Sequence, residues 1–170
     1  MAHGAYPISS MYQFVADPGQ PKPELYRELT AAADALTAGE KDGVANMANV
    51  AALIWQFLPE LNWAGFYRAI DGELVLGPFC GKPACIRIPL GQGVCGTAAA
   101  SGESQLVADV NAFPGHIACD TASRSELVVP VSRDGRVIAV IDLDAPREGR
   151  FDADDRAGVE ALAKEIADRI

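Results

Sequence analysis

Two pairs of short apolar runs, each pair divided by a tight-turn sequence, most constrain what this chain can fold into. The candidate hairpins occupy residues 61–79, with Asp71-Gly72 at the turn, and residues 127–143, with Arg133-Asp134-Gly135 at the turn. Asp-Gly between β-branched and aromatic runs is typical of a β-hairpin. We therefore predict two antiparallel hairpins that lie next to each other in one sheet.

Amphipathic stretches that fit helices stand at both ends of the chain. From Pro23, a favourable first helical residue, apolar residues recur at helical spacing. A second such stretch covers residues 42–58 and a last one covers residues 152–170. Residues 1–21 lack this periodicity, so we expect a surface arm there. Residues 22–170 are predicted to form a single α+β domain, with helices packed against a mostly antiparallel sheet.

Length and charge exclude several classes of protein. A chain of 170 residues fits one domain. Fourteen Lys and Arg against 23 Asp and Glu give a formal net charge of −9, which has the wrong sign for binding phosphates, so we expect no nucleic-acid partner. The longest apolar stretch, residues 44–58, is broken by amide side chains and is too short to cross a bilayer. With no secretory signal at the N-terminus, we expect a cytoplasmic protein without a membrane span.

Four cysteines and one histidine form the densest set of reactive side chains. They are Cys80, Cys85, Cys95, His116 and Cys119. One interpretation is a zinc site, although structural zinc ligands usually come in closely spaced, matched pairs. A second is buried inert thiols, which suits Cys80 better than Cys119 because Cys119 stands in a polar segment. In a third, Cys119 is a nucleophile and an earlier cysteine resolves its sulfenic acid. A cysteine hydrolase that uses His116 lacks a clear orienting partner.

Gly91, Gly93 and Gly96 match the dinucleotide-binding pattern GxGxxG between a predicted strand and a predicted helix. No βαβ unit follows, and an antiparallel domain of this length has no room for a doubly wound sheet, which argues against a dinucleotide. Two alternatives stay open. The glycines form a tight strand-to-helix turn, or they free backbone N–H groups at a helix N-terminus for a small carboxylate.

Three acidic residues of the second hairpin are candidates for a binding site. Asp142 and Asp144 are separated by one residue, so on a strand both side chains leave the same face. A two-residue turn places Glu126 on the other face, whereas a three-residue loop over 133–135 places it opposite Asp142. We favour the three-residue loop. Clustered carboxylates need an ammonium group or a metal to offset their repulsion, and the pKa of at least one is raised. The alternative is that the acids end a strand and face water.

Two aromatic residues, Trp63 and Tyr67, are four residues apart on a predicted strand and therefore share a face. They are either core residues or one wall of a pocket for a group the size of a thioether.

The segments NWAGFYR, LVLGPFCGKPACIRIPLGQGVCGT, GHIACD, SE and IDLDAP, taken in order, resemble the free methionine-(R)-sulfoxide reductases, a family of GAF-domain enzymes. The resemblance covers about residues 62–151 and includes Cys85, Cys95 and Cys119, the three cysteines by which the family is recognised. It implies a GAF-like α+β fold with a central antiparallel sheet of about six strands, often in homodimers. The sequence departs from the family at Cys80, where a polar residue such as Gln is expected, and this leaves Cys80 as an alternative disulfide partner.

The resemblance also implies an activity, the thioredoxin-dependent reduction of the R epimer of free methionine sulfoxide in the cytosol, without a metal or an organic cofactor. It makes Cys119 the nucleophile, Cys85 the resolving cysteine and Cys95 an accessory thiol. The implied substrate site is lined by acidic and aromatic side chains: Glu126, Asp142, Asp144, Trp63 and Tyr67. Together with the raised pKa expected for clustered carboxyl groups, the resemblance suggests Asp142 or Asp144 as the proton donor. The alternative is a GAF-type sensor that binds a small ligand or responds to oxidation without turnover.

Overall fold

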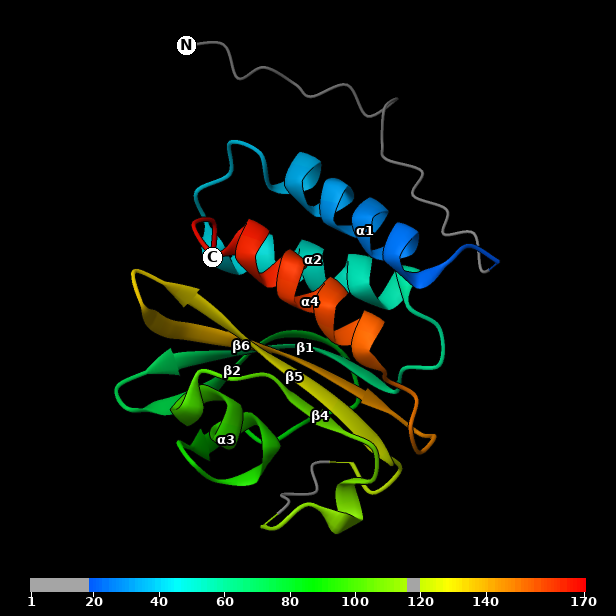
Figure 1. The fold of residues 1–170 in the computed structure, drawn as a ribbon. Coiled ribbons are helices and arrows are strands. Elements are labelled where there is room, and N and C mark those ends of the chain that lie inside the picture. The colour runs from blue at the N-terminus through cyan, green and yellow to red at the C-terminus, as the bar shows by residue number, and fades with distance from the viewer. Residues whose placement is uncertain (1–18, 116–119) are drawn as a thin grey trace.

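The computed structural model, which describes residues 19–115 and 120–170, has helices on both faces of one sheet (Figure 1). Three helices stack over one face, two of them directly on the strands and the first of the chain on the outer side of those two, and a shorter helix covers part of the other face. The three stacked helices are α1 (Lys22–Thr37), α2 (Gly43–Phe57) and α4 (Ala153–Ile166), and the shorter helix is α3 (Gly93–Ser101). None of the helices in the described residues is long and apolar enough to cross a membrane.

The sheet has six strands, and every pair of neighbours is antiparallel. The strands are β1 (Trp63–Ile70), β2 (Glu73–Gly81), β3 (Arg87–Pro89), β4 (Gln105–Val107), β5 (Ser125–Arg133) and β6 (Arg136–Ala145). Their spatial order is β3-β2-β1-β6-β5-β4. The two hairpins therefore meet through β1 and β6, and the predicted α+β fold with a six-stranded antiparallel sheet is confirmed.

Side-chain caps fix the starts of two helices close to where the sequence predicts them. The Asp42 carboxylate accepts hydrogen bonds from the first backbone N–H groups of α2, and Asp152 does the same for α4 in a capping box with Asp155. The last helix ends at Ile166, four residues before the predicted end. Residues 1–18 of the predicted arm lie outside the described residues, so the division into residues 1–21 and 22–170 stays a prediction.

The turn of the second hairpin differs from the favoured three-residue loop. Arg133 pairs with Arg136, so the turn has two residues, Asp134 and Gly135, and both have the positive φ angles that such a turn requires. Farther along, the register shifts by one residue, because Val131 pairs with Ala139 and Ile138 is left as a bulge. Glu126 therefore lies opposite Asp144, and the predicted pairing with Asp142 is wrong. The three carboxyl groups nevertheless share one face of the sheet, as expected, because the bulge at Ile138 places Glu126 on the face of the two aspartates.

Alternation along β6 separates two buried regions. Ile141 and Leu143 pack in the larger core with α1, α2 and α4. Asp142 and Asp144, between and beyond them, face the smaller cluster that contains α3, Trp63 and Tyr67. The stacked helices thus stabilise the strands, while the other face of the same strands is available for polar chemistry.

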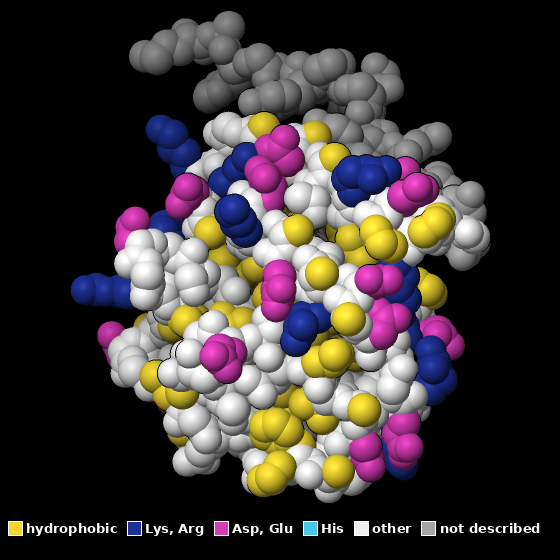
Figure 2. All heavy atoms as spheres, viewed as in Figure 1, with side chains coloured by type: hydrophobic (Ala, Val, Ile, Leu, Met, Phe, Trp, Pro, Cys, Tyr) yellow, Lys and Arg dark blue, Asp and Glu magenta, His cyan; other side chains and the backbone are white. Residues whose placement is uncertain are grey.

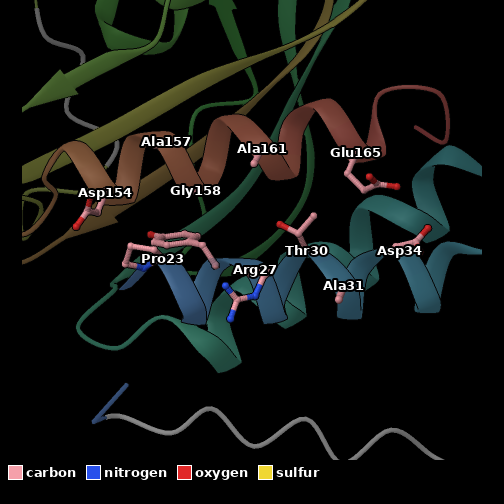
Figure 3. A pocket seen from close by; sticks show the side chains of 11 residues that line it. Pro23, Arg27, Thr30, Ala31, Asp34, Asp154, Ala157, Gly158, Ala161 and Glu165 are labelled. Carbon is pink, nitrogen blue, oxygen red and sulfur yellow. The ribbon is translucent and has the colours of Figure 1, made fainter. Parts of the chain in front are cut away.

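Contact between α1 and α4 includes an ion-pair network and an open groove. The Tyr26 ring packs directly on Gly158, where a Cβ atom would overlap it. The Tyr26 hydroxyl donates to the Asp155 carboxylate at 2.9 Å. Beside this contact lies a groove of about 490 Å³. Figure 3 shows small side chains such as Ala157 and Ala161 along it, with Arg27 at its edge.

On the face drawn in Figure 2, Lys and Arg side chains are interspersed with Asp and Glu side chains.

Candidate active site

A small cavity of about 30 Å³ lies on the α3 side of the sheet. It is enclosed by β1, β5, β6, the first turn of α3 and the residues that precede β5. Its lining residues are Tyr67, Ile88, Gly93, Val94, Cys95, Asp120, Ser123, Glu126, Asp142 and Asp144. Every acidic residue proposed from the sequence is among them, together with Tyr67 and Cys95.

The acids meet through the sheet register. Glu126 on β5 lies directly opposite Asp144 on β6, and Asp142 is its diagonal neighbour. Glu126 and Asp142 are each only 6% exposed. The Cys95 thiol approaches from α3, with its Sγ atom 3.9 Å from Glu126 Oε1. One donor atom from each of Cys95, Glu126 and Asp142 lies within 4.8 Å of the others.

Burial dominates the electrostatics of this cluster. Desolvation raises the pKa of Asp142 to about 7. Desolvation and then the negative charge of Asp142 raise the pKa values of Glu126 and Asp144 well above the ordinary range. The same two causes raise the pKa of the Cys95 thiol. At neutral pH the site therefore holds protonated carboxyl groups and a neutral Cys95 thiol.

Asp142 has an unused hydrogen-bonding atom. Its Oδ1 is buried and has no hydrogen-bond partner among the described residues. Neither Asp142 nor Asp144 forms a salt bridge with a described Lys or Arg. A buried carboxylate oxygen without a donor costs free energy, so the site is suited to a ligand that brings a positive charge or N–H donors.

The two aromatic residues proposed as a pocket wall also hold the loop that carries Cys85. The Trp63 and Tyr67 rings stack with centroids 5.8 Å apart, and the Phe79 ring also stacks on Trp63, with centroids 5.2 Å apart. The Tyr67 hydroxyl donates to the backbone carbonyl of Cys85 at 3.0 Å, and Trp63 Nε1 donates to the carbonyl of Lys82 at 3.1 Å. The wall and the cysteine loop are therefore one connected unit.

The cysteines occupy different environments. Cys85 is disulfide-bonded, whereas Cys80 and Cys95 are free thiols. Cys80 pairs with Ala64, whose side chain belongs to the helical core, so Cys80 is on the face of the sheet opposite to the cavity. Cys119 and His116 lie outside the described residues.

Sequence reasoning missed Asp120, Asn62 and Ser123. Asp120 lines the cavity and forms a salt bridge with Lys82 at 3.2 Å. Its carboxylate accepts from the backbone N–H of Ala122, and this bond, followed by Lys82 and Asn62, lowers the pKa of Asp120. The Asn62 amide also donates to the Ser123 hydroxyl at 3.0 Å. These residues stand in polar segments without periodicity, so the only available signal was that Asp120 follows Cys119.

The glycine-rich turn brings a helix N-terminus to the cavity. Gly93, Val94 and Cys95, the first three residues of α3, line it, and backbone N–H groups in a first helical turn lack partners within the helix. A Cβ atom on Gly96 would overlap the carbonyl oxygen of Pro89, so this glycine allows α3 to pack against β3. The close packing at Gly96 fits the tight turn expected from the sequence, and the small-carboxylate alternative stays a prediction.

The chain is similar to known proteins in both sequence and structure. The model of the GAF domain family matches residues 45–170. The free methionine-R-sulfoxide reductase of Escherichia coli K12 is 48% identical over 145 residues, which cover 85% of this chain and 88% of that protein. The enzyme of the same name from Saccharomyces cerevisiae is 44% identical and covers 85% of each chain.

Among solved structures, the free methionine-R-sulfoxide reductase of Neisseria meningitidis, crystallised with its substrate, superposes with a TM-score of 0.87. It is 43% identical, and the match covers 93% of this chain and 95% of that chain. Identity at this level over most of both chains, together with the GAF match, identifies the chain as a member of the GAF-domain family of free methionine-R-sulfoxide reductases.

Proposed function

We propose that this protein reduces free L-methionine (R)-sulfoxide to L-methionine through a cysteine sulfenic acid and an intramolecular disulfide. The observation that carries the proposal is a buried carboxylate cluster beside a helix N-terminus, in which Asp142 and Asp144 have no salt bridge to a described Lys or Arg. The named relatives support the activity, and the site supports the choice of a free amino acid as substrate.

Free methionine sulfoxide is a zwitterion, and the two polar parts of the cavity are complementary to it. Its ammonium group would contact Glu126 and Asp142, giving the unpaired Asp142 Oδ1 a donor. Its carboxylate would accept from backbone N–H groups of the first turn of α3. Its side chain would extend along Trp63 and Tyr67. A residue within a protein has no such charged groups, which explains a preference for the free amino acid.

The chemistry needs a nucleophile and a proton donor. The Cys119 thiolate would attack the sulfoxide sulfur. Of the two candidate aspartates, Asp142 pairs with the ammonium group, so Asp144 in its protonated form delivers a proton to the sulfoxide oxygen. Desolvation and the negative charge of Asp142 raise the pKa of Asp144 well above its ordinary range, which keeps that carboxyl protonated near neutral pH. The hydroxyl then moves from the substrate sulfur to Cys119 Sγ as the bond between the two sulfur atoms breaks, so methionine leaves and Cys119 becomes a sulfenic acid. Cys95, with its raised pKa, is suited to contact the substrate as a neutral thiol.

Turnover then needs two further exchanges. The Cys85 thiol condenses with the sulfenic acid, which releases water and forms a disulfide between Cys85 and Cys119. A dithiol, which we propose to be thioredoxin in the cytoplasm, reduces that disulfide and is itself oxidised. The disulfide state of Cys85, beside free Cys80 and Cys95, favours Cys85 over Cys80 as the resolving residue. A homodimer stays a prediction.

The test is an NADPH-linked assay with thioredoxin, thioredoxin reductase and each epimer of free L-methionine sulfoxide. We expect NADPH consumption with the R epimer and none in the Cys119→Ser variant, while Cys80→Ser retains activity. No NADPH consumption by the wild type, together with no formation of methionine when a small dithiol replaces thioredoxin, would leave a GAF sensor that binds ligand without turnover. Within an active enzyme, Glu126→Gln is expected chiefly to raise KM, because it weakens an ammonium contact and leaves the nucleophile intact.

A further inference from the structure

Cys95, Glu126 and Asp142 bring one thiol and two carboxyl groups together from α3, β5 and β6. We infer that this cluster binds one zinc ion, and that zinc excludes the substrate because it occupies the same carboxylates as the substrate ammonium group. The zinc site itself stands on the geometry, whereas the competition rests on the proposed function.

The three donor atoms already lie near one another. Each is within 4.8 Å of the other two, and Cys95 Sγ is 3.9 Å from Glu126 Oε1. Tetrahedral zinc has Zn–S bonds of about 2.3 Å and Zn–O bonds of about 2.0–2.2 Å, which puts the ligand atoms roughly 3.5 Å apart. Small side-chain movements would therefore bring the three ligand atoms to the spacing of a tetrahedral zinc site. Glu126 and Asp142, two of the three ligands, are held by strands β5 and β6.

A second observation points to a cation. Asp142 is 6% exposed, lines the cavity and leaves Oδ1 without a hydrogen-bond partner among the described residues. A metal bond to this oxygen would replace the missing donor. The cavity, about 30 Å³, has room for an ion with one or two waters, since a water needs about 10–15 Å³ of such space. A water molecule would supply the fourth ligand.

The donor set selects the kind of metal. Mg²⁺ and Ca²⁺ prefer six or more oxygen ligands, whereas a thiolate with two carboxylates matches the borderline-soft Zn²⁺. The cysteine and the carboxyl groups would release their protons when the ion binds. Zinc at this position is an inhibitor of the proposed reaction, which itself requires no metal.

The experiment is a zinc titration of the oxidised full-length protein that carries Cys80→Ser. A count of the thiols in the denatured protein should give one per chain, which is that of Cys95. Zinc chloride is partitioned between the protein and a chromophoric chelator. We expect one zinc ion per chain, and a loss of zinc affinity of at least about tenfold in both Cys95→Ser and Glu126→Gln. Mutation of residues that only hydrogen-bond to a metal ligand already lowers metal affinity by about that factor, and loss of a ligand itself should cost no less. The exposed Glu103→Gln is the matched control and should bind zinc normally, and magnesium chloride should not compete.

Zinc X-ray absorption supplies an independent readout, with one sulfur ligand at about 2.3 Å expected. Unchanged zinc affinity in Glu126→Gln, or a spectrum without sulfur, would overturn the inference. Circular dichroism checks that each variant folds. If Cys95→Ser does not fold, the zinc affinity of Glu126→Gln alone tests the inference. Methionine (R)-sulfoxide should lower the apparent zinc affinity of the parent protein. Zinc binding that depends on Cys95 but ignores the sulfoxide would keep the zinc site and contradict the proposed position of the ammonium group.

Discussion

Asp155 and Asp142 are both buried aspartates, but they have opposite surroundings. Asp155 is fully buried and accepts from the Tyr26 hydroxyl, contacts Lys22 at 2.6 Å and contacts Arg150 at 3.3 Å. Asp142 has no salt bridge with a described Lys or Arg, and one of its oxygens has no donor among the described residues. Asp155 thus completes the packing of α1 against α4, whereas Asp142 is incomplete until a ligand arrives.

The difference separates a structural carboxylate from a functional one. Burying a charge is tolerated when cations and hydrogen bonds compensate it, as at Asp155. Where the fold leaves out the cation, burial favours the protonated carboxyl group, and a cationic ligand stabilises the ionised form that burial disfavours. The central claim is that the ammonium group of the substrate is the cation that Asp142 lacks in the folded protein.

Removing Asp155 should have the largest effect on stability. The Asp155→Ala change leaves the buried Arg150 with only its longer ion pair to the exposed Glu60, at 3.8 Å, and removes the acceptor of Tyr26, which should lower the free energy of unfolding by about 3–5 kcal/mol. Urea unfolding at pH 7 measures this. The exposed Asp168→Ala is the control, with a change within about 0.5 kcal/mol. A loss below about 1 kcal/mol for Asp155→Ala would mean that this network contributes no more than a surface ion pair.

Removing the charge of Asp142 should act in the opposite direction. Its folded pKa of about 7 is above its unfolded value, so its ionisation destabilises the protein as the pH rises from about 4 to about 7. An asparagine side chain does not ionise, so Asp142→Asn should be more stable than the wild type at pH 8, on the order of a few kcal/mol, because one pKa unit corresponds to about 1.4 kcal/mol. The gain should shrink toward about pH 4.5 in urea unfolding. An advantage that is independent of pH would contradict the assigned cause.

Disturbing the contact beneath Asp155 should have an intermediate effect. Alanine favours helices more than glycine does, yet Gly158→Ala should destabilise the protein by about 1–3 kcal/mol, because its methyl group would displace the Tyr26 ring. Thermal unfolding measures the loss. In a Tyr26→Ala background the same change should become neutral or stabilising. A cost that persists without the ring would locate the strain elsewhere.

Loosening the loop beside Asp142 should have the smallest effect. Tyr67→Phe removes the hydroxyl that donates to the Cys85 carbonyl and keeps the aromatic wall. We expect a loss of about 1 kcal/mol in unfolding free energy and faster amide exchange over residues 84–86. Unaltered exchange in this segment would show that other contacts hold the loop.

Local sequence determined what could be predicted. Asp42 and Asp152 marked helix starts because a cap needs only its neighbouring N–H groups. The second hairpin was harder, because Asp134-Gly135 favours a two-residue turn that would turn Glu126 into the helical core. The bulge at Ile138 reconciles that turn with burial of the apolar face. Asp120 and the unpaired Asp142 oxygen depend on tertiary contacts, which leave no periodic signal in the sequence.

The most direct test of the central claim compares two ligands that differ in one group. The affinity of the Cys119→Ser protein is measured by calorimetry for L-methionine (R)-sulfoxide and for its deaminated analogue, which keeps the carboxylate and the sulfoxide. Loss of a buried charge pair costs about 2–5 kcal/mol, so the analogue should bind at least roughly 30-fold more weakly. Equal affinity for the two ligands would contradict the claim that the buried acids await the substrate ammonium group.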